Sequence, residues 1–301
     1  MKKKDADTNV TMIEKDMGKV TAKQRVVKII VQVFLYAFLI LMAIIVLFPF
    51  YWMLNSSLKT IEEYRWTVPS FFPHQVMFHN YVDAFNTANL GQLFVNTMYV
   101  GIVSTILSLI ITVLSAFAFA RLEFKGKNAL FAALLATMMI PGELFTITNF
   151  STVTKLQWTG TFTVLIIPFL VSVFYIYLLR QNFLQIPNEL YLAAKVDGKS
   201  DWSFLWKVLV PLAMPTLTTI FILKLMGAWN SYVWPDLITH SNKDMWLITV
   251  GLRNSFDTAG NIDDYGAQMA ATVIVTVPLL LVFIFFRKYI MRGVGRAGIK
   301  G

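Results

Sequence analysis

Two ionisable side chains, Glu143 and Lys224, lie within apolar stretches of this 301-residue sequence. A charge in an apolar surrounding is costly, so such groups usually face a water-accessible path or pair with an opposite charge. Both lie roughly 23 to 26 Å along a helix from the basic end of their stretch, at about 1.5 Å per residue. Ala228 and Ser231 follow Lys224 on one helical face. The spacing favours a central polar path in which Glu143 and Lys224 pair. The alternative is two separately hydrated groups near the apolar boundary, with Lys224 reaching toward water.

A small aromatic and amide cluster, Trp229, Asn230 and Tyr232, follows Lys224. Sugars need hydrogen-bond partners for their hydroxyl groups and flat apolar surfaces for their ring faces, and these side chains offer both. We therefore place the cluster, with Glu143 and Lys224, along a candidate substrate path. The competing explanation is an aromatic belt at a bilayer surface, which is the interpretation we prefer for Trp234 and Trp246.

Other chemistry is excluded by residue type and spacing. Asp197-Gly198-Lys199-Ser200 is similar to the end of a phosphate-binding loop, but Ala193 stands where that loop needs its first glycine. The chain has no cysteine. His74 and His79 lie in an expected outer loop without a neighbouring carboxylate pattern typical of a metal site, and His240 is apart from both. We therefore expect no catalytic site, no metal site and no cofactor bound by this chain.

Composition identifies the elements that must position these residues. The chain is 56% hydrophobic and 14% charged, with a mean hydropathy of +0.61, which excludes a large soluble enzyme. Six apolar runs are long enough to cross a bilayer, and all must be helices because an open sheet cannot span lipid. We expect Pro168, Pro211, Pro215 and Pro278 to bend helices. The runs are Ile29 to Leu54, Phe94 to Ala120, Asn128 to Phe150, Thr161 to Leu179, Lys207 to Trp234 and Gly266 to Tyr289.

The lysines and arginines predict the orientation. Twenty of the 26 fall on the same side of the predicted membrane as the two chain termini. The positive-inside rule makes that side cytoplasmic. We expect a cytoplasmic tail over residues 1–28, a six-span domain over 29–290 and a second tail over 291–301, in a bacterial inner membrane. The net charge of +9 then reflects topology and not nucleic-acid binding. An ion-gradient-driven transporter or channel, and a membrane enzyme using Glu143, stay open as alternatives. The former would predict inverted repeats and interrupted helices around midplane ion ligands, and the sequence shows us neither.

The stretch from Ile186 to Pro215 is the most structured part predicted outside the membrane. Asn188 is a candidate N-cap and Gly198 can end the helix in a left-handed conformation. Ser200 can cap a second helix that continues into the fifth span. An apolar face formed by Leu190, Ala193, Ala194 and the Asp197 side is too small for a core of its own. We expect this helix-turn-helix to dock on a partner.

This segment resembles the EAA loop of ABC-importer permeases. The pattern is roughly Pro-x-Glu-Leu-x-Glu-Ala-Ala-x-x-Asp-Gly, followed by an aromatic residue and two prolines. From Phe48 onward the chain also resembles the smaller permease subunit of the maltose-type, binding-protein-dependent carbohydrate family. The matching loop residues are Pro187, Glu189, Leu190, Ala193, Ala194, Asp197, Gly198, Phe204, Pro211 and Pro215. Further matching stretches are Phe48-Pro49-Phe50, Asn55 to Lys59, Ala118 to Arg121, Phe124 to Gly126, Met139 to Gly142, Leu179 to Gln181, Trp229-Asn230, Trp234-Pro235 and Gly298 to Gly301.

The resemblance implies a function and a set of partners. A coupling helix would seat in a cytoplasmic ATPase through Glu189, Leu192, Ala193, Ala194, Asp197 and Gly198. Two such ATPase subunits would use ATP and Mg, and a second, different permease subunit would complete the path. An extracellular solute-binding protein would deliver a sugar or oligosaccharide to the outer loops, Ser56 to Gln92 and Pro235 to Tyr265. Another polar solute, such as a glycerol phosphate, is the alternative cargo.

Two positions depart from the family pattern. Leu192 stands where the carboxylate before the two alanines is usual, and Lys199 replaces the usual alanine after the glycine. Glu189 precedes Leu192 by three residues on the same helix face, so it is the candidate substitute. The alternative is that Glu189 only stabilises the start of the helix.

Overall fold

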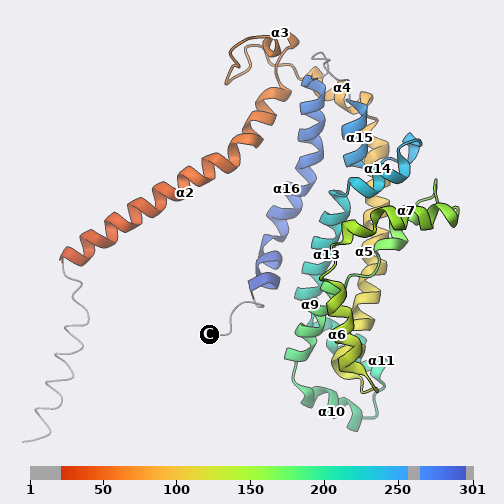
Figure 1. The fold of residues 1–301 in the computed structure, drawn as a ribbon. Coiled ribbons are helices and arrows are strands. Elements are labelled where there is room, and N and C mark those ends of the chain that lie inside the picture. The colour runs from red at the N-terminus through yellow and green to blue at the C-terminus, as the bar shows by residue number, and fades with distance from the viewer. Residues whose placement is uncertain (1–21, 257–264, 296–301) are drawn as a thin grey trace, which may run out of the picture. The chain divides into compact units, whose positions relative to one another are not determined.

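The structure is a computed structural model that describes residues 22–256 and 265–295. Every regular element in these two ranges is a helix, as the sequence predicts. The chain forms two compact units, residues 1–55 and 56–301, which are described separately. The first is dominated by α2 (Ala22–Ser57), which begins before the predicted Ile29 (Figure 1). Most of the predicted tails, residues 1–28 and 291–301, falls outside the described residues.

Three helices are long and apolar enough to cross a membrane without interruption: α2, α5 (Leu90–Arg121) and α16 (Tyr265–Gly295). The other three predicted spans are not single helices, which corrects the sequence-based boundaries. Counting each bent pair as one span gives up to six. The pairs are α6 (Lys127–Thr137) with η1 (Gly142–Phe145) and α7 (Thr146–Lys155), bent by 84°; α8 (Thr163–Ile166) and η2 (Ile167–Phe169) with α9 (Val173–Gln185), bent by 48°; and α11 (Asp201–Phe204), η3 (Leu205–Leu209) and α12 (Val210–Leu212) with α13 (Met214–Trp229), bent by 78°.

Proline explains where these spans break. Pro168 lies in η2, and Pro211 and Pro215 flank the 78° bend at Ala213. A proline lacks the backbone N–H that would continue the helical ladder and clashes with the preceding turn. The bends expected at these three prolines are therefore confirmed. Pro278, in contrast, lies inside α16, which is not divided there.

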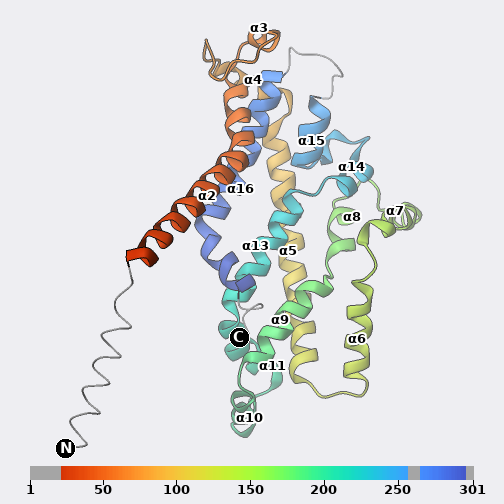
Figure 2. The ribbon, with the colours of Figure 1, turned by 60° about the vertical axis from the view of Figure 1, so that its left-hand side comes forward.

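The long helix α5 organises the second unit. α9 and α13 pack along it (Figure 2), and its buried face carries small polar residues at Thr97, Ser104, Thr105, Ser108 and Thr112. Short side chains allow helices to approach closely in an apolar surrounding. In both views α10 (Asn188–Val196) and α11 lie at one end of α5. α3 (Ile61–Tyr64), α4 (His79–Thr87) and α15 (Ile248–Ser255) lie at the other end.

The second predicted outer loop is folded against α5 where it is described; residues 257–264 of it lie outside the described part. α14 (Val233–Thr239), η4 (Lys243–Met245) and α15 follow one another there. The Asn96 amide of α5 donates to the carbonyl oxygens of Asp244 and Trp246 at 2.7 and 3.0 Å. The Thr97 hydroxyl accepts from the Ile248 amide at 2.8 Å. These bonds make the segment part of the core.

The aromatic-belt interpretation of Trp234 and Trp246 is wrong. Their side chains are only 6% and 7% exposed, and each indole donates to a backbone carbonyl, of Val164 and Thr239 respectively, at 3.0 Å. Aromatic residues of a belt keep the polar end of their ring in contact with water. These two tryptophans are instead enclosed by the folded segment after α13. The sequence pattern alone could not show that this segment folds back onto the bundle.

The first predicted outer loop is ordered by a buried carboxylate, Glu63. It accepts hydrogen bonds from the Ser70 hydroxyl at 3.0 Å and from the His74 and Gln75 amides at 2.9 and 3.3 Å. Burial opposes ionisation of Glu63, but these hydrogen bonds stabilise the anion and bring its pKa below the ordinary value. The chain from Glu63 to Gln75 is therefore closed around one charged group.

Candidate functional site

The helix-turn-helix after α9 has the predicted turn. α10 ends at Val196, and Gly198 adopts φ +71°, the left-handed conformation that glycine tolerates without strain. Ser200 then caps α11, because its hydroxyl accepts from the Ser203 amide at 3.2 Å. The predicted cap at the start of α10 is wrong: Pro187 occupies that position and Asn188 is already helical. We refer to α10, the turn at Gly198 and α11 as the elbow.

α10 is amphipathic, but not in the predicted register. Tyr191 and Ala194 are half-buried and pack against the core formed by α5, α9 and the start of α13. The predicted docking face included Ala194, which instead packs on the bundle, so the face free to meet a partner lies on the other side of α10. This opposite side exposes Glu189, Leu192, Ala193 and Val196, which occupy positions i, i+3, i+4 and i+7 of one helical face. We call these four residues the exposed stripe. Leu190, Asp197 and Gly198 are also exposed.

Arg121, the last residue of α5, fixes the start of the elbow. Its guanidinium donates to the carbonyl oxygens of Phe183 and Ile186 at 2.7 and 2.6 Å, and to the Asn188 side-chain oxygen at 3.0 Å. The carbonyls at the end of α9 have no further helical partners, and a positive charge suits this negative helix end. Asn188 thus serves as an acceptor for Arg121 and not as a cap.

Asp201, the first residue of α11, links α11 to α10. The Tyr191 hydroxyl donates to Asp201 Oδ1 at 2.7 Å, and Lys195 Nζ lies 2.8 Å from the same oxygen. The hydrogen bond to Asp201 raises the pKa of Lys195, so this lysine stays charged. The Tyr191 ring also meets the Phe204 ring edge-on at 5.1 Å. The elbow is therefore a small rigid body seated on the bundle.

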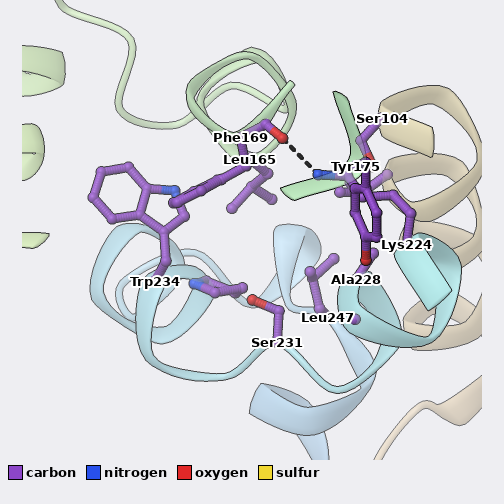
Figure 3. Close-up of a pocket in the computed structure, with 12 residues that line it drawn as sticks. Ser104, Leu165, Phe169, Tyr175, Lys224, Ala228, Ser231, Trp234 and Leu247 are labelled. Atoms are coloured by element: carbon purple, nitrogen blue, oxygen red, sulfur yellow. Dashed lines mark hydrogen bonds between the residues drawn. The ribbon is translucent and has the colours of Figure 1, made fainter. Parts of the chain in front are cut away.

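A cavity of about 280 Å³ lies farther along the bundle, between α5, α8, α9, α13 and α14 (Figure 3). Lys224, Gly227, Ala228 and Ser231 line it from α13 and its C-terminal end, which agrees with the shared helical face predicted for Lys224, Ala228 and Ser231. The remaining lining residues are Val100, Ser104, Leu165, Phe169, Tyr175, Trp234, Pro235 and Leu247. The lining is mostly apolar with a few polar groups, as is typical of a small-solute site.

Lys224 does not pair with Glu143 in this structure. Its ammonium donates to the Phe169 carbonyl at 2.6 Å, which is the contact drawn in Figure 3. That carbonyl is available because the α8–η2 helix breaks there, ahead of α9. Glu143 lies in η1, is exposed and does not line the cavity. The broken helix, which was not predicted in detail, supplies the partner that Lys224 needs.

The three residues of the aromatic and amide cluster do not line the cavity either. Trp229 is only 4% exposed and packs on Phe94 with the ring centroids 5.6 Å apart. Asn230 ends α13, and its amide donates to the Met226 carbonyl. Tyr232 is exposed in the short break before α14. Their placement along a substrate path therefore stays a prediction.

Sequence reasoning missed Ser104, Tyr175, Phe169 and Trp234 as lining residues. A signal for Ser104 was present, since polar residues inside an apolar span usually face the protein interior. Tyr175 and Phe169 could not be found in this way because their position depends on the 48° break between η2 and α9.

Curated relatives share most of their length with this chain. An arabinooligosaccharides transport system permease protein of Halalkalibacterium halodurans is 33% identical, over 77% of this chain and 82% of that protein. A diacetylchitobiose uptake system permease protein of Streptomyces coelicolor is 31% identical, over 87% and 86%. An inner membrane ABC transporter permease protein of Escherichia coli is 32% identical, over 88% and 95%.

A solved structure has the same fold. It comes from a bacterial ABC transporter involved in the import of the acidic polysaccharide alginate, with a TM-score of 0.78 and 23% identity. The match covers 90% of this chain and 99% of that one. Residues 108–296 match the family described as binding-protein-dependent transport system inner membrane component. With more than half of its length matched and several relatives above 30% identity, the chain belongs to this family of membrane permease components.

Proposed function

We propose that the chain is a permease subunit of an ATP-driven importer in a bacterial inner membrane, and that it passes a sugar or oligosaccharide by alternating access. The names of the relatives, which transport arabinooligosaccharides and diacetylchitobiose, support this cargo class. A second permease subunit, two cytoplasmic ATPases and an extracellular solute-binding protein complete the transporter. Both termini are cytoplasmic in this proposal, and catalysis resides in the ATPases, which bind ATP and Mg.

One observation carries the proposal: the exposed stripe stands at the end of α5 opposite to α15, on an elbow held rigidly by Arg121 and Asp201. The apolar part of the stripe, Leu192, Ala193 and Val196, is small enough to be stable in water but gains by burial against a partner. Because the elbow cannot rotate independently of α5 and α9, a push by an ATPase on α10 moves the bundle. The ends of the bundle near α3 and α15 then receive the solute-binding protein.

Val196→Asp tests the elbow. Val196 is 88% exposed, so the substitution leaves the fold intact but places a charge in the proposed interface. We expect the ATPase subunits to be lost on purification of the assembled transporter, and sugar uptake into proteoliposomes to fall at least about tenfold. Val68→Asp is the matched control for ATPase retention alone, because Val68 is 77% exposed at the other end of the unit, so the ATPases should stay bound. Its uptake is not the comparison, because Val68 lies in the loop proposed to receive the solute-binding protein. ATPase retention by the Val196→Asp variant, or uptake that persists without ATP hydrolysis, would contradict the proposal and favour a gradient-driven transporter.

Glu189→Gln tests whether this carboxylate replaces the one missing at Leu192. Both residues lie on the exposed stripe. We expect the variant to reduce solute-stimulated ATP hydrolysis and Leu192→Glu to restore it in the double variant. If Glu189→Gln changes helicity of the elbow but not ATP hydrolysis, Glu189 only stabilises the helix start.

A further inference from the structure

The cavity beside Lys224 has an unbalanced charge. Of the twelve described residues that line it, Lys224 carries the one formal charge, and the polar groups around it are the hydroxyls of Ser104, Tyr175 and Ser231. The carboxylate nearest in sequence to the lining, Asp236, is engaged elsewhere: Oδ1 accepts from Asn254 at 3.0 Å and lies 3.5 Å from the His240 ring. Within residues 22–256 and 265–295, no carboxylate lines the cavity to balance this cation.

The contact with Phe169 satisfies only part of Lys224. An ammonium group has three donors, and one points to the Phe169 carbonyl at 2.6 Å. Figure 3 shows the ammonium between Phe169 and Tyr175 at the edge of the cavity. The residue as a whole is half-buried, while its ammonium faces the open cavity, where a ligand can reach the remaining donors. A carbonyl dipole also leaves the net charge uncompensated, which is costly in an apolar surrounding.

We propose that this cavity receives an anionic group of the cargo, so that the transporter takes an acidic sugar, one bearing a carboxylate or a phosphate, in preference to the neutral sugar of the same shape. This inference rests on the proposed function and adds the charge of the substrate to it. The anion accepts the free donors of Lys224, while the hydroxyls of Tyr175 and Ser231 bond the neutral parts of the sugar. The Ser104 hydroxyl already donates to the Gly101 carbonyl at 3.2 Å, so it serves the sugar as an acceptor. The apolar lining residues of the cavity, including Leu165 and Trp234, cover the sugar ring.

The test compares acidic sugars with neutral counterparts that share the same sugar ring. The complete transporter, purified with its partner subunits, is titrated with galacturonate oligosaccharides, with their methyl esters, and with glucose 6-phosphate against glucose. Binding is measured by thermal stabilisation and by titration calorimetry. We expect the acidic member of at least one pair to bind about ten- to a hundredfold more tightly, as a charge-assisted hydrogen bond in a cavity provides. The galacturonate and phosphate arms separate the two sources of negative charge.

Lys224→Met and Lys224→Arg assign the effect to this side chain. Methionine keeps the length without the charge, so the ratio of acidic to neutral affinity should fall to about one, whatever its effect on the neutral ligands; arginine should retain the preference. Tighter binding of the neutral member of each pair, or a preference that survives Lys224→Met, would overturn the inference but leave the proposed function standing. If no sugar of either charge binds the wild-type complex, the proposed cargo class fails together with the inference.

Discussion

Replacing Arg121 by methionine should release the elbow from the bundle. Arg121 is 8% exposed, and its guanidinium makes three hydrogen bonds, to Phe183, Ile186 and Asn188. Methionine fills much of the same volume but leaves two backbone carbonyls without their charged donor. Each buried acceptor left unsatisfied costs about 1–3 kcal/mol. We take about 3 kcal/mol as the loss, which raises the open population of the elbow about a hundredfold.

Amide hydrogen exchange over residues 188–196 of the chain in lipid nanodiscs measures this opening. Exchange there should accelerate about a hundredfold, while α5 and α16 stay protected. Arg121→Lys should give an intermediate rate, because an ammonium cannot reach all three acceptors in a planar fork. Arg180→Met is the matched control: Arg180 donates to the Phe119 carbonyl and lies over the Phe131 ring, without touching α10. Unchanged exchange in Arg121→Met, or equal acceleration in Arg180→Met, would refute the role given to Arg121.

Three further substitutions test the packing that surrounds the site. Gly251→Ala would drive a Cβ into the Leu93 side chain, so we expect about 1–3 kcal/mol of destabilisation, measured by thermal unfolding in detergent and relieved by Leu93→Ala. Trp229→Phe removes a buried indole N–H that has no hydrogen-bond partner in the described structure; stability should hold or rise, and a loss of uptake alone would instead support a place for Trp229 on the substrate path. The pKa of Glu63 is lower in the folded than in the unfolded chain, so its contribution to folding stability is fully present above the unfolded-state pKa and is lost as the pH falls through the folded-state pKa. Protease resistance of residues 63–75 should therefore decline at acidic pH, and Glu63→Gln should remove that pH dependence.

The sequence by itself determined the class of the protein and the location of the elbow. Apolar runs of sufficient length, the distribution of lysine and arginine, and the spacing from Pro187 to Gly198 follow from local rules of helix length, charge and turn conformation. These rules act within a few residues, so they can be applied without knowing what lies nearby in space. Gly198 and Ser200 accordingly adopt the predicted turn and cap.

The tertiary structure decided which residues meet. The face of α10 that seats on the bundle, the burial of Trp234 and Trp246, and the carbonyl that accepts from Lys224 all depend on contacts between segments far apart in the chain. Above all, the helix break after Phe169 leaves the Phe169 carbonyl free to accept, and Lys224, 55 residues later in the chain, donates to it. Helical periodicity predicts a side chain's face, but which neighbour covers that face depends on how the broken helices pack.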